Sequence, residues 1–342
     1  MKILVDITHI EYINFFRNSL QALKARNHDI IILLLQRGNL LAIARKELKG
    51  MQLVRLGKYS GGIFSVIFQA NILRFFQLLF FLFKYKVDIG VSCGSLPLAI
   101  CLKLKRVPNL QFDDDIHRRI IYFLQKFSYS KLFVPPICRQ AKKIHIINAL
   151  REWSYLSPKY FKPNPLMPKQ YGINLKEYIF IREIDTKSLN YICQKKNIVT
   201  IFANKLPPSI KILFSLENKK DKQYYPQDWI ILEEPVENIH SLMYYSKIII
   251  SSGDSMPREG ALLGVPSIYC GSRKMPANKF IEKKGMFYQI EPQEVAIFVE
   301  KILHGDILFE NQDTFRQRLF QEWDDVTELI VKEVEKYIAK VQ

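Results

Sequence analysis

The chain has 342 residues, of which 48% are hydrophobic, and it carries a formal net charge of +17. This length exceeds that of an ordinary single domain and predicts two domains, each with its own apolar core. The five cysteines are scattered singly, without a CxxC pair, so neither a zinc site nor a disulfide framework is predicted. They are Cys93, Cys101, Cys138, Cys193 and Cys270.

The positive charge is concentrated in the first half of the chain. Residues 1–172 contain 27 Lys and Arg against 9 Asp and Glu, whereas residues 173–342 contain 23 against 24. A half-molecule of one sign indicates an anionic partner, such as a membrane surface, a nucleic acid or a phosphorylated substrate. The alternative is a lysine-rich solvent face without a specific partner. Because no recognition-helix or RNP-type motif accompanies the charge, we do not expect nucleic acid as the partner.

Two segments bear on the cellular location. The N-terminal run MKILVDI lacks the long apolar core and cleavage site of a signal peptide, so we expect a cytoplasmic protein. The most apolar stretch, residues 63–83, contains four polar residues that are costly at bilayer depth, and we predict a helix that does not span a membrane. These four are Gln69, Asn71, Arg74 and Gln77.

The same helix is unusually rich in phenylalanine. Its seven phenylalanines offer more aromatic surface than one core-facing stripe readily buries. They are Phe64, Phe68, Phe75, Phe76, Phe80, Phe81 and Phe83. Together with the basic first half, this pattern predicts that the first domain docks on an anionic membrane at the inner face of the plasma membrane. The alternative is a helix wholly buried between the sheet and neighbouring helices.

In the first half, short apolar strands alternate with amphipathic helical stretches, which predicts a parallel sheet with crossover helices. We expect strands at 2–7, 29–35, 52–56, 88–92, 109–112, 131–136 and 142–148. We expect helices at 12–26, 40–48, 64–85, 97–105 and 117–127.

Residues 157–172 contain four prolines and a glycine and are the predicted linker, because they continue neither the strand pattern nor the helix pattern. The alternation then restarts, with strands expected at 177–183, 197–202, 229–234, 247–253, 266–271 and 286–290. Helices are expected at 187–195, 239–245, 257–263, 294–303 and 314–341. The sequence therefore predicts an α/β protein with two Rossmann-like domains whose parallel sheets face across a cleft. We place them at 1–165 and 173–318, with a terminal helix, 319–342, that returns to the first domain.

The segment 247–270 carries the most specific signal for a binding site. An apolar strand runs into a turn of small polar residues, and a helix follows with Pro257 in its first turn, a favoured place for proline. This arrangement aims backbone N–H groups and the positive helix end at the edge where open α/β sheets bind ligands. We predict a diphosphate site at this turn, formed by Ser252, Gly253, Asp254 and Ser255.

Three further residues of the second half are candidate contacts of the ligand at this site. Glu259, in the first turn of that helix, has the position to hold ribose hydroxyls, or merely offsets the helix dipole. Arg182 ends a predicted strand, where a guanidinium clamps a phosphate, unless it pairs with Glu183 or Glu233. His240 opens a predicted helix and either contacts the base or caps the helix.

Candidate catalytic residues lie in the first half. His9 follows the first predicted strand and is a candidate base or phosphate contact. The acids Asp113, Asp114 and Asp115 follow another strand, and with His117 they offer a base for an acceptor hydroxyl. The alternatives are a surface histidine and an acidic helix N-terminus. Since parallel strands share one carboxyl edge, we expect His9 and residues 113–117 at the same edge of the sheet.

Several stretches resemble the prokaryotic domain-of-unknown-function family 354 from end to end. They are VDITHIEYINFFRN at 5–18, VSCGSLPLAI at 91–100, FDDDIHR at 112–118, EYIFIRE at 177–183 and NIHSLMYYSKIIISSGDSMPREGALLGVPSI at 238–268. The last stretch also resembles the nucleotide-binding segment of GT-B glycosyltransferases and of non-hydrolysing UDP-N-acetylglucosamine 2-epimerases, in which a glutamate at the place of Glu259 meets the ribose. The resemblance implies a GT-B fold, a UDP-linked sugar as substrate, and no bound metal or cofactor.

The sequence also departs from the family. The first loop of the family is rich in histidine, whereas here His9 stands with Tyr12 and Asn14 at the other places, which argues against a multi-histidine site. Ile116 stands where the family tends to have glutamate.

Among the reactions, we expect sugar transfer to a glycan or lipid-linked acceptor in cell-surface glycan or polysaccharide biosynthesis. The epimerases that the chain resembles carry an acid in a turn whose counterpart here, residues 94–96, has none. Epimerisation or hydrolysis of a nucleotide-sugar is the first alternative. A non-catalytic or nucleic-acid-binding role is the second.

Overall fold

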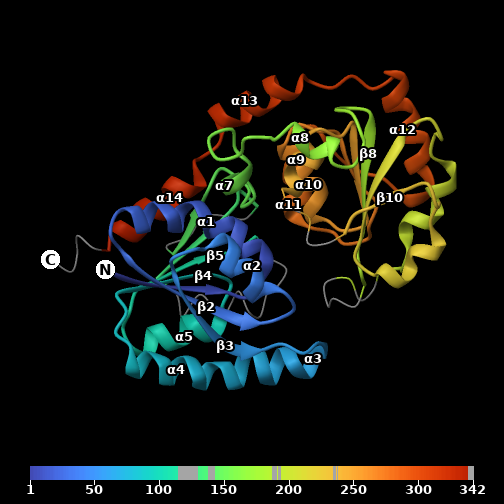
Figure 1. Cartoon of the computed structure of the whole chain (residues 1–342). Coiled ribbons are helices and arrows are strands. Elements are labelled where there is room, and N and C mark those ends of the chain that lie inside the picture. Colours follow the sequence, from blue (N-terminus) through green and yellow to red (C-terminus); the bar gives the residue numbers. More distant parts are fainter. Residues whose placement is uncertain are drawn as a thin grey trace. The chain divides into compact units, whose positions relative to one another are not determined.

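The computed structural model of the chain contains two units, each built on a parallel β-sheet (Figure 1). Unit 1 comprises Met1–Tyr155 and Trp323–Gln342, and unit 2 comprises Leu156–Glu322. The structure describes residues 1–114, 130–137, 143–186, 191, 194–233, 236 and 238–337. The two Rossmann-like domains predicted from the alternation of strands and helices are confirmed. The first domain was expected to end at residue 165, whereas the division lies at Tyr155.

The sheet of unit 1 has the strand order β3-β2-β1-β4-β5-β6-β7, and all its pairs are parallel. Its strands are β1 (Lys2–Ile7), β2 (Asp29–Gln36), β3 (Gln52–Lys58), β4 (Ile89–Cys93), β5 (Asn109–Phe112), β6 (Lys131–Val134) and β7 (Ile144–Ile146). The order reverses between β1 and β4, so a switch point lies at their carboxyl ends, where open α/β sheets bind ligands.

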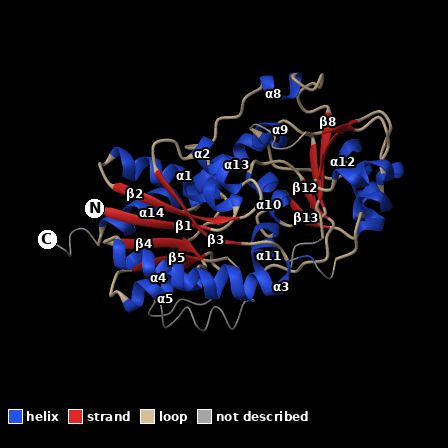
Figure 2. Ribbon diagram, turned by 60° about the horizontal axis from the view of Figure 1, so that its bottom comes forward, coloured by secondary structure: helices blue, strands red, loops and turns tan. Residues whose placement is uncertain are grey.

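Helices cover both faces of this sheet (Figure 2). They are α1 (Ile10–Ala25), α2 (Leu40–Glu47), α3 (Gly62–Phe64), the π-helix η1 (Ser65–Leu73), α4 (Arg74–Lys84), α5 (Leu96–Leu104), α7 (Trp153–Leu156) and α14 (Val326–Glu335). On one face, α4 and α5 pack over a core that includes Leu4 and Leu33. On the other face, α1 packs against β1, β2 and the C-terminal helix α14.

The sheet of unit 2 has the order β10-β9-β8-β11-β12-β13, again with every pair parallel. Its strands are β8 (Tyr178–Glu183), β9 (Lys211–Leu216), β10 (Ile230–Ile231), β11 (Ile248–Ser251), β12 (Ser267–Tyr269) and β13 (Phe287–Gln289). Here the order reverses between β8 and β11. The carboxyl ends of these two strands therefore form the switch point of unit 2.

The helices of unit 2 are short. The α-helices are α8 (Leu166–Lys169), α9 (Ile239–Tyr244), α10 (Ser255–Leu262), α11 (Pro276–Glu282), α12 (Val295–His304) and α13 (Gln312–Glu322). The 3-10 helices are η3 (Ile198–Ile201), η4 (Ala203–Lys205), η5 (Lys219–Tyr224) and η6 (Pro292–Glu294). The core formed with η3 and α12 includes Val199, Phe214 and Val299.

Several predicted elements differ from the structure. The strand expected at 197–202 forms the 3-10 helix η3 instead, because Asn197 adopts a left-handed φ of 53° and the Val199 amide donates to the Glu183 carboxylate and not to a strand. The strand β9 was not predicted. The single helix expected at 314–341 is interrupted, and Asp325 caps the start of α14 by accepting from the Glu328 amide.

Other expected elements were placed differently or lie outside the described residues. The predicted linker packs on unit 2, with Phe161 and Met167 buried and the Asn164 amide donating to Ser241 Oγ over 2.9 Å. The helix expected at 117–127 and most of that at 187–195 lie outside the described residues.

Candidate functional site

The predicted diphosphate turn lies at the switch point of unit 2. β11 ends at Ser251, and α10 begins at Ser255 with Pro257 as its third residue. Amides that begin a helix have no partner within the helix, so those of Ser255 and Met256 lie at its positive end. This backbone arrangement suits an anion such as a diphosphate.

Hydrogen bonds inside the protein fix the shape of this turn. The Ser252 hydroxyl donates to Glu183 Oε1 over 2.6 Å, and the Gly253 amide donates to Ser251 Oγ over 3.0 Å. A Cβ atom at Gly253 would lie 2.6 Å from Ile184 Cγ2, so a larger residue does not fit there. The sequence predicted that Ser252 contacts the ligand. In the structure its side chain is buried and supports the turn from within.

Asp254 also acts inside the turn. Its side chain is 2% exposed and accepts from Arg258 over 2.6 Å, from Arg273 over 3.4 Å and from the Tyr191 hydroxyl. Burial alone would raise the pKa of this carboxyl, but the two guanidinium groups and the hydrogen bonds lower it to about 2. Asp254 is therefore an anion that positions two arginines, and it would repel a diphosphate that approached it directly.

Arg273 is a residue that the sequence analysis missed. It follows β12, its side chain is 20% exposed, and Asp254 fixes one side of its guanidinium group. Its position after a strand, at the edge that holds the turn, was the signal that could have identified it. A partly exposed guanidinium next to a helix N-terminus adds a cation to the proposed anion site.

Glu183, at the end of β8, is the buried support of the site. It accepts from Ser252 Oγ, from the Val199 amide over 2.7 Å and from the Tyr225 hydroxyl over 3.2 Å. Burial raises the pKa of this carboxyl to about 7, although the three hydrogen bonds oppose the increase. From the sequence, Glu183 was predicted only as a possible partner of Arg182.

The structure brings the predicted residues His240 and Glu259 together. His240 Nε2 lies 3.4 Å from Glu259 Oε1, and the two side chains are 16% and 12% exposed. Both lie on helices of one face, α9 and α10, which pack against each other. Glu259 was predicted in the first turn of this helix, but α10 begins at Ser255, so Glu259 is its fifth residue and lies beyond the first turn. It therefore does not act as an isolated charge that offsets the helix dipole.

Arg182 was expected to contact a phosphate or to pair with Glu183 or Glu233. Its guanidinium instead donates to Ser215 Oγ over 2.7 Å and to the carboxylate of Glu217, both at the carboxyl end of β9. Because β9 was not predicted, neither partner could be foreseen. The guanidinium remains at the carboxyl edge of the sheet, held in one orientation.

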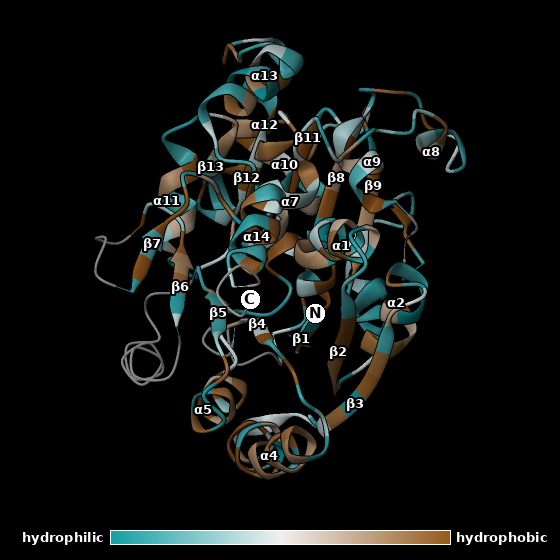
Figure 3. Cartoon of the chain, turned by 90° about the vertical axis from the view of Figure 1, so that its left-hand side faces the viewer, coloured by the Kyte–Doolittle hydropathy of each residue, from teal (hydrophilic) through white to brown (hydrophobic). Residues whose placement is uncertain are grey.

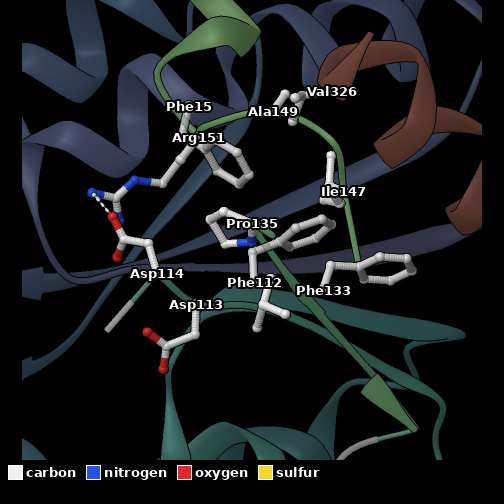
Figure 4. A pocket seen from close by; sticks show the side chains of 11 residues that line it. Phe15, Phe112, Asp113, Asp114, Phe133, Pro135, Ile147, Ala149, Arg151 and Val326 are labelled. Carbon is white, nitrogen blue, oxygen red and sulfur yellow. Dashed lines mark ion pairs between the residues drawn. The ribbon is translucent and has the colours of Figure 1, made fainter. Parts of the chain in front are cut away.

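In unit 1, the carboxyl edge gathers the other candidates. The Arg151 guanidinium lies 3.2 Å from the Asp114 carboxylate (Figure 4). It also lies 3.2 Å from the Glu11 carboxylate and over the ring of Tyr12. His9 Nδ1 lies 3.9 Å from Glu11 Oε1. His9 and Asp114 therefore occupy the same edge of the sheet, bridged through Glu11 and Arg151.

A pocket adjoins this cluster. Figure 4 shows Asp113 and Asp114 on one side and the rings of Phe15, Phe112 and Phe133 on the other. Its free space is about 20 Å³, enough for a water molecule but not for a sugar ring. The other two predicted catalytic residues, Asp115 and His117, lie outside the described residues.

Arg151 was also missed by the sequence analysis. Burial disfavours its charge, but Asp114, Glu11 and Glu152 outweigh that effect and raise its pKa well above the ordinary value. The guanidinium is thus a permanent cation beside the candidate acids. Like Arg273, it follows a strand of the sheet, β7, after a short connection.

The switch point of unit 1 contains a buried acid, Asp6, at the end of β1. Asp6 pairs with the guanidinium of Arg74 and accepts from Ser95 Oγ over 2.6 Å. Its carboxylate is therefore fully engaged and structural. Cys93, nearby, is buried, and burial raises the pKa of its thiol, so it is not a nucleophile at neutral pH. Within the described residues, no group of three or more His, Cys, Asp or Glu side chains could hold a metal ion.

Comparison with solved structures identifies the fold. The UDP-GlcNAc 2-epimerase from Neisseria meningitidis bound to UDP-GlcNAc superposes with a TM-score of 0.72 and 13% identity, over 98% of this chain and 100% of that chain. Spinosyn Forosaminyltransferase SpnP superposes with a TM-score of 0.71 and 12% sequence identity, over 99% of both chains. The UDP-GlcNAc 2-epimerase of Methanocaldococcus jannaschii in complex with UDP-GlcNAc and UDP superposes with a TM-score of 0.70 and 15% sequence identity, over 98% of this chain and 100% of that chain. The fold is that of the GT-B enzymes, as the sequence predicted.

Two sequence comparisons place the chain in a family. Uncharacterized protein MJ0665 of Methanocaldococcus jannaschii is 28% identical over 116 residues, which are 32% of this chain and 34% of that protein. The chain thus matches about a third of the length of this curated relative. The pattern of the family described as Protein of unknown function (DUF354) matches residues 154–339, more than half of the chain, and the chain therefore belongs to this family.

Proposed function

We propose that this protein is a cytoplasmic glycosyltransferase that moves a sugar from a nucleotide-sugar to an acceptor hydroxyl. The observation that carries the proposal is the turn between β11 and α10, where helix amides, the Arg273 guanidinium and the His240–Glu259 pair adjoin the switch point of unit 2. Relatives in fold that were solved with UDP or UDP-GlcNAc support UDP as the nucleotide.

In this proposal, unit 2 holds the leaving group. The amides of Ser255 and Met256 and the Arg273 guanidinium stabilise the diphosphate while its bond to the sugar breaks. Glu259 accepts hydrogen bonds from the ribose hydroxyls, and His240 orients its carboxylate. Because backbone dipoles and guanidinium groups supply the positive charge, the reaction needs no bound metal or cofactor.

Unit 1 holds the acceptor. His9 or Asp113 removes the proton from the attacking hydroxyl, while Arg151 fixes Asp114 beside them. The acceptor is a glycan or a lipid-linked sugar, and the pathway is the synthesis of cell-surface polysaccharide. Asp115 and His117 remain proposed members of this site from their sequence positions.

A UDP-N-acetylhexosamine 2-epimerase is the second candidate, favoured by the epimerases among the structures of similar fold. Against it, residues 94–96 contain no acid, and the nearby Asp6 is neutralised by Arg74. A 2-epimerase must remove and return the proton at C2, and the described residues beside this turn offer no unengaged carboxylate for that step.

One experiment distinguishes the candidates. UDP-GlcNAc is incubated with the protein in D₂O, with and without glycan and lipid-linked acceptors, and the products are followed by NMR. A transferase releases UDP when an acceptor is present, and the His9→Ala and Asp113→Asn variants release it more slowly. Deuterium at C2 of recovered UDP-hexosamine without acceptor would instead establish the epimerase. A protein that binds no nucleotide would refute both.

A further inference from the structure

The continuous helical segment formed by α3, η1 and α4 exposes a row of large apolar side chains. We call these residues the Phe face: Phe64, Ile67, Phe68, Ile72, Leu73, Phe76, Phe80 and Phe83. Each is between 44% and 74% exposed, and they recur every one to four residues along one side of the helix. Figure 3 shows α4 largely in the hydrophobic colour, at the edge of the unit next to α5. Solvent exposure of so many phenylalanines indicates a surface that binds a partner or a membrane when the protein functions.

The length and composition of this helix would also suit a membrane span. The helical stretch Ser65–Lys84 is 20 residues long, and an 18-residue window within it has a mean hydropathy of 1.8 with 22% of the window buried. The polar residues of the segment decide against spanning. Arg74 is 1% exposed, donates to the Leu56 carbonyl over 2.9 Å and pairs with Asp6 in β1. A spanning helix would leave both charges of this pair without their partner.

The π-helix η1 explains how Ser65 and Arg74 both point inward. Ser65 and Arg74 are nine positions apart, which corresponds to about 2.5 turns of an α-helix and would place them on opposite faces. A π-helix has wider turns, closed over five residues instead of four. Both side chains are accordingly buried, and the Ser65 hydroxyl donates to Gln69 Oε1 over 2.6 Å. The polar groups of Ser65 and Arg74 are thus satisfied within the protein, whereas the Phe face and Gln77 are exposed.

Basic residues border the Phe face at the end of α4 and at the end of the neighbouring α5. We call them the basic rim: Lys84, Lys86, Lys103, Lys105 and Arg106. The Lys105 ammonium lies 4.0 Å from the centre of the Phe83 ring, which joins the rim to the Phe face. Besides the buried Arg74, residues 52–106 contain seven Lys and Arg and a single acid, Asp88. The surface around the Phe face is therefore strongly cationic.

We propose that the Phe face and the basic rim dock unit 1 on an anionic phospholipid surface, with the helix lying in the plane of the interface. The phenylalanine rings enter the boundary between headgroups and acyl chains, while the rim contacts the lipid phosphates. Charge complementarity selects this occupant over a second copy of the chain, because two copies would bring like-charged rims together. Docking does not depend on the proposed reaction, since it requires no sugar donor.

Sedimentation of the full-length protein with vesicles tests the proposal. We expect binding to phosphatidylcholine vesicles that contain phosphatidylglycerol, little binding to pure phosphatidylcholine, and release by high salt. The double variant Phe76→Ser with Phe80→Ser should abolish binding. Neutralising three rim residues, Lys84→Gln, Lys103→Gln and Lys105→Gln, should weaken binding on the order of a hundredfold, about fivefold per lysine.

Matched controls come from unit 2. Leu308→Ser removes an exposed apolar side chain, and Lys283→Gln with Lys301→Gln removes exposed lysines; neither should change binding. Thermal unfolding of each variant verifies that it is folded. Equal binding to neutral vesicles, or equal loss in the controls, would overturn the proposal. So would protein that alkaline carbonate fails to extract, which indicates a spanning helix, or a dimer that the Phe76→Ser and Phe80→Ser changes convert to a monomer without any vesicle binding.

Discussion

His240 Nε2 lies 3.4 Å from Glu259 Oε1, so two residues that the sequence marked independently form one pair on α9 and α10. Their side chains are only 16% and 12% exposed, so most of their surface is shielded from water. The pair gives Glu259 a fixed orientation. In the proposed function, this orientation aims the carboxylate at the ribose.

We predict that Glu259→Ala weakens UDP binding by about 1–3 kcal/mol, because a partly buried hydrogen-bonding group is lost. His240→Ala should weaken it less. In a double-mutant cycle measured by calorimetry, the two changes should be coupled by about 0.5–3 kcal/mol. The exposed Glu300, on α12, supplies the control, and Glu300→Ala should leave the affinity unchanged. Full affinity in Glu259→Ala would remove the ribose assignment.

Glu183 predicts a pH dependence of stability. Burial raises its pKa in the folded protein to about 7, from an ordinary value of 4.5. The folded state therefore holds this proton more tightly than the unfolded state, and its contribution is complete below pH 4.5 and is lost as the pH rises towards 7. The difference corresponds to about 3 kcal/mol.

The Glu183→Gln variant, which stays neutral, should not show this loss between pH 4.5 and 7. Urea unfolding of the wild type and the variant across that range measures the effect. Exposed Glu294→Gln, in η6, is the control and should retain the slope of the wild type. Parallel slopes for wild type and Glu183→Gln would show that the carboxyl titrates normally.

Asp254 changes the stability with pH in the direction opposite to that of Glu183. Its pKa is lowered from 3.8 to about 2, since the charges of Arg258 and Arg273 outweigh burial. The stability that it contributes is present above its unfolded pKa and is lost as the pH falls from 3.8 to about 2, by ~2 kcal/mol. Asp254→Ala should cost about 3–5 kcal/mol at neutral pH, because it leaves the buried Arg258 charge without its carboxylate.

Asp254→Ala combined with Arg258→Met removes both charges and should restore much of that stability. Chemical denaturation at neutral pH compares the two variants. If the double variant were as unstable as the single one, the loss would come from the shape of the turn and not from an uncompensated charge.

Gly57, in β3, should be required for the position of Arg74. Its φ is +81°, and a Cβ atom there would lie 2.7 Å from Arg74 Cδ. Gly57→Ala therefore adds a collision to a backbone strain of about 1–2 kcal/mol. Gly61 also has a positive φ, +97°, but no atom lies within 4 Å of the corresponding Cβ position. Thermal unfolding should show a larger loss for Gly57→Ala than for Gly61→Ala, and equal losses would contradict the role assigned to Arg74.

Much of the architecture could be predicted from the sequence. Strands of a parallel sheet are buried on both faces, so they appear as short apolar runs, and the runs at β1, β2, β8 and β11 were found for that reason. The turn before α10 was predicted because small residues and an early proline are local requirements of a helix start. The strand β9 was missed although its sequence, KILFSL, is equally apolar.

The composition of the site depends on contacts between residues far apart in sequence. Ser252 and Asp254 were expected to face a ligand, but the buried partners Glu183 and Arg258 turn them inward. Arg182 meets Glu217 because β8 and β9 are neighbours in the sheet, a pairing that no local pattern specifies.

The sequence by itself determined the local features of this protein: strand and helix periodicity, the turn at 252–255, the excess of charge in the first half and the phenylalanine-rich helix. Each follows from residues close together in the chain, whose propensities act over a few positions. The tertiary structure alone decided which polar groups are buried and paired, and that the Phe face points outward while Arg74 points inward. The reason is that burial and ion pairing depend on packing between elements, where the cost of an unsatisfied polar group selects the orientation of every side chain.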